Sequence, residues 1–115
     1  ALSRVYKKKL KNLPLKFQLI SKNSLSSYHL FTVQITDKAY DRDELFRFLK
    51  INKIASQVHY VPLYRQPYYT SLGFGENYCK NTEDYFQRCL SIPLHQKLKE
   101  DDIDYVAKKL TEFFS

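Results

Sequence analysis

The sequence contains no tryptophan and no methionine, and only two glycines and two cysteines among its 115 residues. Two glycines cannot build a phosphate-cradling loop, and the dinucleotide-binding, P-loop and G-x-S-x-G motifs are all absent. Cys79 and Cys89 form no C-x-x-C pair, so their spacing indicates neither a zinc site nor a disulfide framework. No apolar run approaches the ~20 residues of a membrane span, and no signal-peptide pattern opens the sequence. We therefore expect one cytoplasmic domain without a membrane partner.

Acidic residues are missing from the first third of the chain. Residues 1–36 contain seven basic and no acidic side chains, whereas residues 37–115 contain twelve of each, so the net charge of +7 belongs to the beginning of the sequence. A basic run at Lys7–Lys11 fits either a solvated helix face or a basic module that binds nucleic acid. We favour the solvated face, because a nucleic-acid binder is expected to carry its basic surface on the folded scaffold.

Hydrophobic periodicity predicts helices that alternate with short strands. The clearest helix start is Asp41 as N-cap with Glu44 as its capping-box partner, and this helix is expected to end near Asn52. Other helices are predicted over Arg4–Leu13, from Asn81 and from Glu100. Strands are predicted over Tyr28–Ile35, Ile54–Tyr60 and Leu90–Leu94, after a short apolar stretch at Leu15–Ile20.

These elements predict which side chains face inward. His29, Phe31, Val33 and Ile35 are expected to line one face of their strand. In the helix from Asn81, the side chains expected to face inward are Tyr85, Phe86, Cys89 and Leu90. The segment 61–78 holds two prolines and both glycines and is expected to be turn-rich. Within His59–Tyr69 the prolines are expected to hold the loop in an extended geometry.

The predicted fold is a small α+β domain of two layers, a short, mostly antiparallel sheet with helices packed on one side. We divide the chain into residues 1–14, the end of a helix that joins it to a preceding domain, and residues 15–115, the domain itself. The first helix has no capping residue, which favours the expectation that further sequence lies upstream.

Candidate catalytic groups are few. His29, His59 and His95 are scattered and offer no metal-binding pair, and Cys89 with His95 is the only conceivable nucleophile and base. Cys89 is expected on an apolar face, and the acidic cluster Glu100–Asp104 is explained as a helix first turn. We therefore assign no catalytic residue and no metal site.

One segment, His59–Tyr69, is unusual. It combines a histidine, four tyrosines, an arginine, a glutamine and two prolines at the end of a predicted strand. Tyrosines present flat apolar faces with polar tips, which suits the binding of a sugar or nucleotide. A loop that covers the sheet, or an oligomer interface, is equally compatible with these residues.

Three ordered blocks of this sequence resemble a known family. They are QVHYVPLYRQPYYTSLG (Gln57–Gly73), NTEDYFQRCLSIPL (Asn81–Leu94) and DIDYV (Asp102–Val106). They resemble the C-terminal end of the DegT/DnrJ/EryC1/StrS family of pyridoxal-phosphate (PLP)-dependent sugar aminotransferases. The sequence Gln57-Val58-His59-Tyr60 is most similar to the branch of the family that aminates a UDP-linked 4-keto-6-deoxy sugar on the way to pseudaminic acid.

The resemblance implies that this chain is the small C-terminal domain of a fold-type I PLP enzyme. Such an enzyme transfers an amino group, with glutamate as the expected donor, to a nucleotide-linked keto sugar in surface-polysaccharide or glycan biosynthesis. The family's Schiff-base lysine and PLP-binding residues lie in a large N-terminal domain that would be this chain's partner. The chain alone is therefore expected to hold no cofactor and to be inactive, and the parent enzyme is expected to be a homodimer.

The family's loop over the active-site cleft carries over to the segment that begins at His59. The resemblance therefore implies substrate-side contacts at His59, Tyr60, Pro62, Leu63 and Tyr64, with Gln66 and Tyr68 as weaker candidates. Tyr60 and Tyr64 are expected to pack on the sugar or base, while His59 orients the loop. Besides the nucleic-acid module, an independent interaction domain without enzymatic partners remains an alternative.

Overall fold

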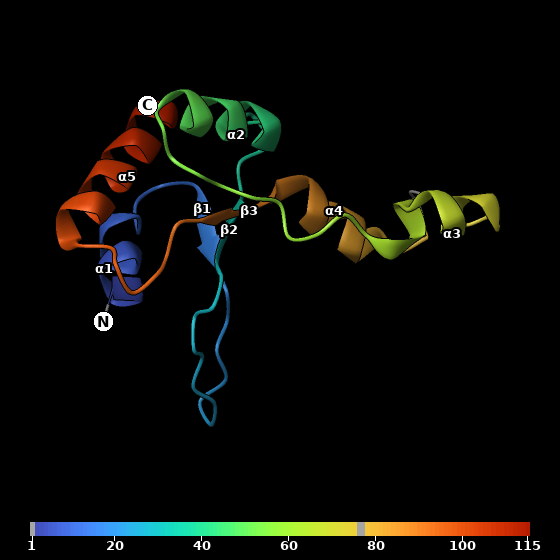
Figure 1. Cartoon of the computed structure of the whole chain (residues 1–115), viewed down its shortest axis with the longest axis horizontal. Helices are drawn as coiled ribbons and strands as arrows, with labels where there is room; N and C mark the ends of the chain where they lie inside the picture. The colour runs from blue at the N-terminus through green and yellow to red at the C-terminus, as the bar shows by residue number, and fades with distance from the viewer. Residues whose placement is uncertain (1, 76–77) are drawn as a thin grey trace.

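A three-stranded antiparallel sheet in the order β1-β2-β3 lies at the centre of the molecule (Figure 1). The computed structural model describes residues 2–75 and 78–115. Its strands are β1 (Leu15–Phe17), β2 (Phe31–Ile35) and β3 (Cys89–Ile92). Its helices are α1 (Leu2–Lys9), α2 (Arg42–Ile51), the 3₁₀ turn η1 (Leu63–Arg65), α3 (Pro67–Ser71), α4 (Lys80–Arg88) and α5 (Glu100–Phe113). The predicted α+β architecture is confirmed.

The central strand β2 separates a core face from a polar face. Phe31, Val33 and Ile35 are buried and alternate with the half-buried Thr32 and Gln34. This period of two matches the alternation of side chains along a strand. His29 was expected on the core face but is exposed and precedes the strand, because the chain bends at Tyr28, whose φ is 50°.

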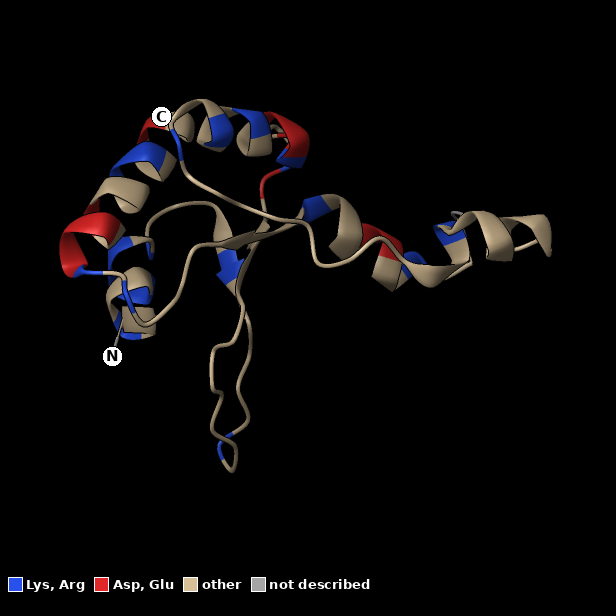
Figure 2. Cartoon of the chain, viewed as in Figure 1, with Lys and Arg blue, Asp and Glu red and all other residues tan. Residues whose placement is uncertain are grey.

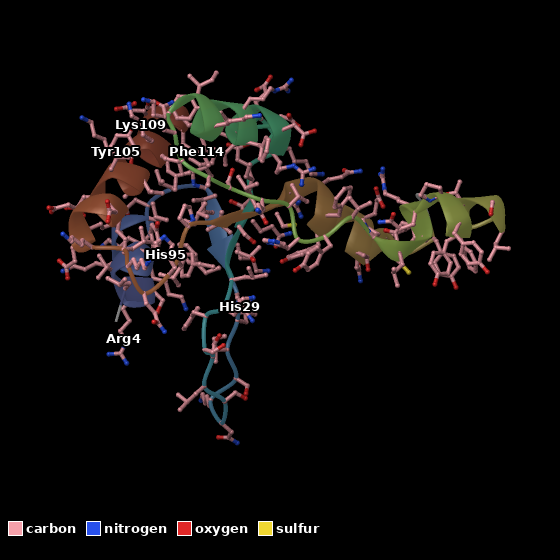
Figure 3. The ribbon with its side chains drawn as sticks, in the orientation of Figure 1. Arg4, His29, His95, Tyr105, Lys109 and Phe114 are labelled. Atoms are coloured by element: carbon pink, nitrogen blue, oxygen red, sulfur yellow. The ribbon has the colours of Figure 1, made fainter. Side chains whose placement is uncertain are left out.

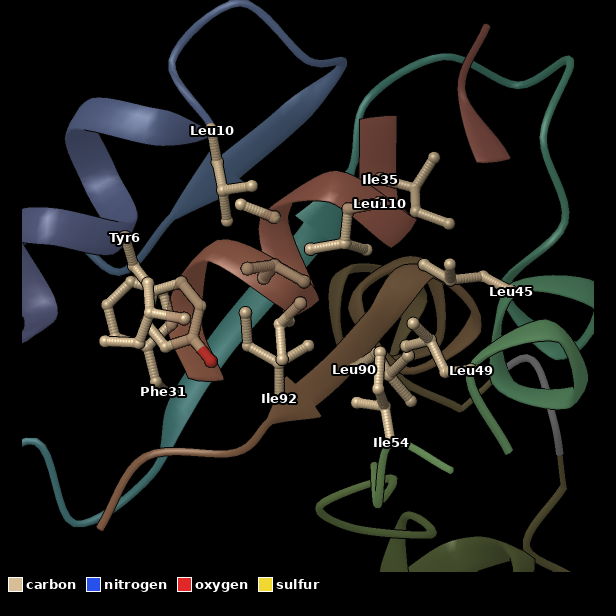
Figure 4. Close-up of a cluster of buried hydrophobic side chains, with 14 residues drawn as sticks. Tyr6, Leu10, Phe31, Ile35, Leu45, Leu49, Ile54, Leu90, Ile92 and Leu110 are labelled. Carbon is tan, nitrogen blue, oxygen red and sulfur yellow. The ribbon is translucent and has the colours of Figure 1, made fainter. Parts of the chain in front are cut away.

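Helices α1, α2 and α5 cover the core face, and their apolar stripes meet the sheet in one cluster (Figure 4). The buried members are Tyr6, Leu10, Phe31, Val33, Ile35, Leu45, Leu49, Ile54, Leu90, Ile92, Ile103, Val106, Ala107 and Leu110. Tyr6 also ties α1 to the end of β3, because its hydroxyl donates to the Pro93 carbonyl at 2.8 Å. Burial raises the pKa of Tyr6, so this donor stays protonated.

Local signals placed two of these helices correctly. Asp41 caps α2 by accepting a hydrogen bond from the Glu44 backbone at 3.0 Å, and α5 begins at Glu100 as expected. At the other end of the chain α1 stops at Lys9 rather than at Leu13, and a turn carries the chain from Leu10 to Leu13 before Pro14.

The strand predicted over Ile54–Tyr60 is wrong. Gln57 forms an isolated antiparallel bridge with Ser91, in which the two residues exchange backbone hydrogen bonds of 3.1 and 2.8 Å. In this register Ala55 lies opposite Pro93, which has no N–H to donate. His59 lies opposite Cys89, whose N–H bonds to the Tyr85 carbonyl at the end of α4. Neither next pair can therefore exchange both of the hydrogen bonds that a regular antiparallel ladder would make there.

Helix α4 differs from its prediction in its start and its buried face. It begins at Lys80 after Cys79, not with Asn81 as its cap. Tyr85 is 42% exposed, whereas Glu83 is buried. Phe86 is half-buried, and Cys89 and Leu90 belong to β3. The inward face of α4 includes the buried carboxylate of Glu83, which has partners outside the helix. The hydrophobic pattern alone therefore predicted the wrong inward face.

Two extensions leave the body of the molecule (Figure 1). One is the 18–30 loop, between β1 and β2, and the other is the aromatic arm, residues 61–75 together with Tyr78. The radius of gyration is 15.5 Å, compared with about 13 Å for a compact chain of this length. None of the helices in the described part of the chain combines the length and apolar character that a bilayer crossing requires.

Arg42 is the one arginine buried in the described part of the chain. Its guanidinium donates to the Phe86 carbonyl at 2.8 Å and to the Cys89 carbonyl at 3.2 Å, and it pairs with Asp43 at 2.6 Å. It therefore joins the start of α2 to the junction between α4 and β3.

Replacing Arg42 with methionine keeps an apolar stem but leaves both carbonyls without this donor. We expect the free energy of unfolding to fall by about 2 to 3 kcal/mol, measured by urea denaturation. Arg47→Met on the exposed side of α2 is the matched control and should change it by less than about 0.5 kcal/mol. Equal effects of the two variants would contradict the role assigned to Arg42.

Candidate functional site

The polar face of the sheet borders a cavity of about 630 Å³ at the base of the 18–30 loop. Figure 3 shows His29 where this loop meets the sheet. Strands β1 and β2, the 18–30 loop, the segment after Gln57 and helix α4 all contribute to its wall. The lining residues are Lys16, Phe17, Gln18, Leu19, Ser26, Ser27, His29, Leu30, Thr32, Val33, Gln34, His59, Tyr60 and Tyr85.

His59 is held in this wall by hydrogen bonds on both ring nitrogens. Nε2 lies 2.9 Å from the Gln57 side-chain oxygen, and Nδ1 lies 2.9 Å from the Ser91 hydroxyl. An amide oxygen only accepts, so in the neutral ring Nε2 donates and Nδ1 accepts from Ser91. The Ser91 oxygen lies 3.0 Å from the Thr32 hydroxyl, which extends the network to β2.

Tyr60 follows His59 in the cavity wall. The ring packs edge-on against His59, with centroids 4.7 Å apart, and the residue is 72% exposed. The peptide bond between the two residues is cis. Because His59 is fixed to the sheet, Tyr60 is an exposed aromatic surface on a well-supported backbone.

The aromatic arm is fastened to α4 through one carboxylate. Glu83 accepts a hydrogen bond from the Tyr64 hydroxyl at 2.7 Å and forms an ion pair with Arg65. The Arg65 hydrogen bond, followed by that of Tyr64, lowers the pKa of Glu83. Desolvation, with the hydrogen bond to Glu83, raises the pKa of Tyr64 to about 12. The carboxylate therefore stays charged and the phenol stays protonated near neutral pH.

The prolines do not hold the arm in an extended geometry, contrary to the prediction for His59–Tyr69, whereas η1 and α3 agree with the turn-rich character predicted for this segment. Pro62 precedes η1, and Pro67 is the first residue of α3, so both prolines start helical turns. A proline's fixed φ suits the first position of a helix as well as an extended chain. The guanidiniums of Arg42 and Arg65 each lie 5.2 Å from the centroid of the Phe86 ring, which adds a second contact between arm, α4 and α2.

The residues proposed from the sequence fall into two groups. His59 and Tyr60 line the cavity, whereas Pro62, Leu63, Tyr64 and Gln66 lie on the arm. Leu63 and Gln66 are exposed, but Pro62 and Tyr64 are buried. Tyr64 therefore presents its hydroxyl to Glu83 within the chain.

Of the cavity wall, sequence reasoning proposed only His59 and Tyr60 as site residues, and it missed the part that comes from the sheet and α4. These residues include Lys16, Thr32, Gln34 and Tyr85. Lys16 and Gln34 are direct partners across β1 and β2. The polar positions that alternate with Phe31, Val33 and Ile35 were the available signal for this face.

Other candidates from the sequence have structural partners. Lys9 pairs with Asp104 at 2.7 Å, and Lys7 donates to the Tyr28 hydroxyl at 3.0 Å, so part of the basic run is satisfied within the chain. Figure 2 shows basic α1 beside the acidic first turn of α5. Cys89 is buried, and desolvation raises the pKa of its thiol, the opposite of an activated nucleophile. No cluster able to hold a metal ion occurs among the described residues.

Sequence comparison matches residues 1–111 to the model of the DegT/DnrJ/EryC1/StrS aminotransferase family. The chain is 42% identical over 88 residues to a pleiotropic regulatory protein of Geobacillus stearothermophilus, an alignment that spans 76% of this chain and 23% of that protein. It is 35% identical over 86 residues to the UDP-4-amino-4,6-dideoxy-N-acetyl-beta-L-altrosamine transaminase of Campylobacter jejuni, spanning 74% of this chain and 23% of that enzyme.

Structure comparison likewise aligns nearly the whole chain with only part of a longer protein. The sugar aminotransferase Spr1654 of Streptococcus pneumoniae, solved in its PLP form, matches with a TM-score of 0.86 and 24% identity. The match covers 96% of this chain and 29% of Spr1654. This likeness shows the fold, and the chain spans less than a third of the proteins that it matches.

Replacing Glu83 with glutamine tests how the arm is held. The amide still accepts from Tyr64 but loses the ionic contact with Arg65, so we expect chymotrypsin to cleave at Tyr68 and Tyr69 about threefold faster or more. Asp84→Asn on the exposed side of α4 is the matched control, because Asp84 pairs only with Arg88 on the same helix among the ion pairs of the described residues. Unchanged cleavage in Glu83→Gln would contradict this attachment.

Acidification should release the same contact. The pKa of Glu83 is lower in the folded chain than in the unfolded chain. The charged carboxylate therefore stabilises the arm fully at pH values above the unfolded pKa, and this stabilisation is lost as the pH falls through the lowered folded pKa. The NMR signals of the Tyr64 and Tyr78 rings, whose centroids lie 6.0 Å apart, should report this transition. The transition should be absent from Glu83→Gln, and its persistence there would assign it to another group.

Proposed function

The chain belongs to the DegT/DnrJ/EryC1/StrS aminotransferase family, and from this premise we propose that it is the C-terminal domain of an enzyme that transfers an amino group from glutamate to a nucleotide-linked keto sugar. The observation that carries the proposal is the family match over residues 1–111. The similar Campylobacter jejuni protein is a transaminase of a UDP-linked amino sugar, which supports this substrate class. The setting we propose is the biosynthesis of surface polysaccharides or other glycans.

The described residues do not fit PLP. A PLP site needs a lysine for the Schiff base and a partner for the pyridine nitrogen, commonly a carboxylate. Among the described residues that line the cavity, Lys16 is the only lysine, and none is an aspartate or glutamate. Lys7 and Lys9 belong to α1 and contact Tyr28 and Asp104. Helix α1 lies at the opposite end of the molecule from α3 (Figure 1). We therefore propose that PLP is held outside this chain and that the chain alone is inactive.

A large domain upstream is the partner that we propose, in an enzyme that works as a homodimer. The chain covers 23% of the Campylobacter jejuni transaminase, which leaves most of such an enzyme outside it. Exposed apolar side chains gather on the arm, including Leu63, Tyr68, Leu72 and Tyr78. Clusters of this kind on a protein surface are typical of docking sites.

The arm and the His59 network have separate roles in this proposal. His59 and Tyr60 contact the substrate from the cavity wall, and Leu63 and Gln66 contact it from the exposed side of the arm. Pro62 and Tyr64 act by positioning the arm, because Pro62 precedes η1 and the Tyr64 side-chain hydroxyl fastens the arm to Glu83.

Reduction with borohydride tests the absence of an aldimine lysine. The purified chain, incubated with PLP and reduced, should show only scattered, low-level labelling of exposed lysines in a peptide map. One lysine labelled stoichiometrically, with the absorbance of an aldimine before reduction, would contradict the proposal that PLP is held elsewhere.

A chimera tests the amine-transfer function. In it, this chain replaces the aligned segment of the Campylobacter jejuni transaminase, and amine transfer to that enzyme's sugar nucleotide is measured. We expect activity, and we expect His59→Ala to raise the KM for the sugar nucleotide about tenfold with a smaller change in kcat. His95→Ala, at an exposed histidine outside the cavity wall and the arm, should leave both constants unchanged. A folded, PLP-loaded chimera without activity would contradict the proposed function.

A further inference from the structure

Ser91 carries a buried hydroxyl behind the wall of the cavity. The residue is 6% exposed, and it is not among the described residues that line the cavity, whereas His59 and Thr32 are. A hydroxyl in this position does not reach a ligand in the cavity directly. Any effect of Ser91 on binding must therefore pass through a residue of the wall.

Three segments of the chain meet at the backbone of Ser91. Ser91 lies opposite Thr32 in the ladder between β2 and β3, and it bridges to Gln57 on its other side. Residues that lie opposite each other in a sheet place their side chains on the same face. His59 follows Gln57 by two residues, so its side chain lies on this face as well. The sheet thus brings the side chains of Ser91, Thr32 and His59 together on its polar side.

The hydrogen bonds among these side chains run in one direction. The Gln57 side-chain oxygen only accepts, so Nε2 of the neutral His59 ring carries the proton and donates it across 2.9 Å. Nδ1 of His59 accepts the single proton of the Ser91 hydroxyl, also at 2.9 Å. Because that proton is used, the Thr32 hydroxyl donates to Ser91 across 3.0 Å. Hydrogen bonds aligned in this way polarise and strengthen one another.

Both ring nitrogens of His59 therefore have partners within the chain. A general base needs a nitrogen that reaches the proton it removes, and Nδ1 of His59 is instead bonded to the Ser91 hydroxyl. The other contact of the ring is with Tyr60, whose centroid lies 4.7 Å away. What His59 offers to a ligand is a fixed ring and a fixed neighbour, Tyr60, which is 72% exposed.

We propose that Ser91 is a positioning residue, which fixes the orientation and the tautomer of His59 and, through that ring, the place of Tyr60 in the cavity wall. The inference rests on the proposed function and deepens it, because it explains how the substrate contacts assigned to His59 and Tyr60 are fixed before a ligand binds. Groups that are ordered in advance lose less conformational freedom on binding. Loss of the Ser91 hydroxyl should therefore weaken binding more than it slows the chemical step.

Ring ¹⁵N NMR of the 115-residue chain tests this positioning directly. In the unaltered chain we expect one neutral tautomer of His59, with its proton on Nε2, and a nuclear Overhauser contact between the His59 and Tyr60 rings. Ser91→Ala removes the donor to Nδ1, so the Nδ1 resonance should move toward that of an unbonded nitrogen, and the ring contact should weaken. A ring protonated on Nδ1 in the unaltered chain, or a ring that Ser91→Ala leaves unchanged, would overturn the proposal.

Two further variants locate the effect at Ser91. Ser56→Ala is the matched control, because the Ser56 hydroxyl is buried without a hydrogen-bond partner in the part of the chain that the structure describes. It should leave the His59 resonances unchanged. Thr32→Val removes the donor to Ser91 but keeps the Ser91 hydroxyl on Nδ1, so its shift should be smaller than that of Ser91→Ala. An equal or larger shift in either variant would contradict the role assigned to Ser91.

A double-mutant cycle in the chimera with the Campylobacter jejuni transaminase separates positioning from a purely structural role. Ser91→Ala should raise the KM for the sugar nucleotide about fivefold, with a smaller change in kcat, because one hydrogen bond to His59 is lost. Added to His59→Ala, the same substitution should raise KM less than about twofold further, since the ring through which it acts is already absent. Effects that multiply in the double variant would show that Ser91 acts independently of His59, against the proposal.

The failure of this inference is distinguishable from the failure of the proposed function. A chimera that transfers amines, together with a His59 ring that Ser91→Ala leaves unchanged, would overturn the role of Ser91 alone. A folded and PLP-loaded chimera that is inactive, together with a ring that Ser91→Ala releases, would overturn the amine-transfer proposal alone. Circular dichroism confirms that each variant is folded, and the tautomer of the unaltered chain tests the proposal even where a variant does not fold.

Discussion

The alternation of side chains along β2 is the constraint on which the rest of the structure depends. Its apolar positions hold three helices against one face of the sheet, and its polar positions, Thr32 and Gln34, remain for the other face. A shift of one residue in register would exchange the two faces and bury polar groups in the core. The packing of the core and the chemistry of the cavity are therefore set by the same five residues, Phe31–Ile35.

The sequence predicted elements whose signals are local. The cap at Asp41 and the acidic first turn of α5 located two helices, because capping depends on residues three or four positions apart. The strand predicted at Ile54–Tyr60 failed for a non-local reason, since its ladder is limited by Pro93 and by the bonded N–H of Cys89. The strand propensity of a segment does not indicate whether the neighbouring strand has free backbone N–H groups to donate to it.

The candidate site was predicted in part. Family resemblance identified His59 and Tyr60, which the structure places in the cavity wall, although their roles remain a prediction. It did not identify Lys16 or Tyr85, which lie far from them in sequence and meet them only through the sheet and α4. The burial of Tyr64 could not be predicted from the sequence either, because it depends on the hydrogen bond between Tyr64 in the arm and Glu83 in α4.

The arm is joined to the domain at few points. A single β-bridge between Gln57 and Ser91 fixes the backbone just before the arm to β3. The Glu83 carboxylate fixes the first turn of the arm to α4. Beyond these attachments α3 contributes no residue to the buried core. Insertions, deletions and substitutions in the arm can therefore accumulate between related proteins without repacking the sheet and its helices, which leaves ligand preference free to diverge on a constant scaffold.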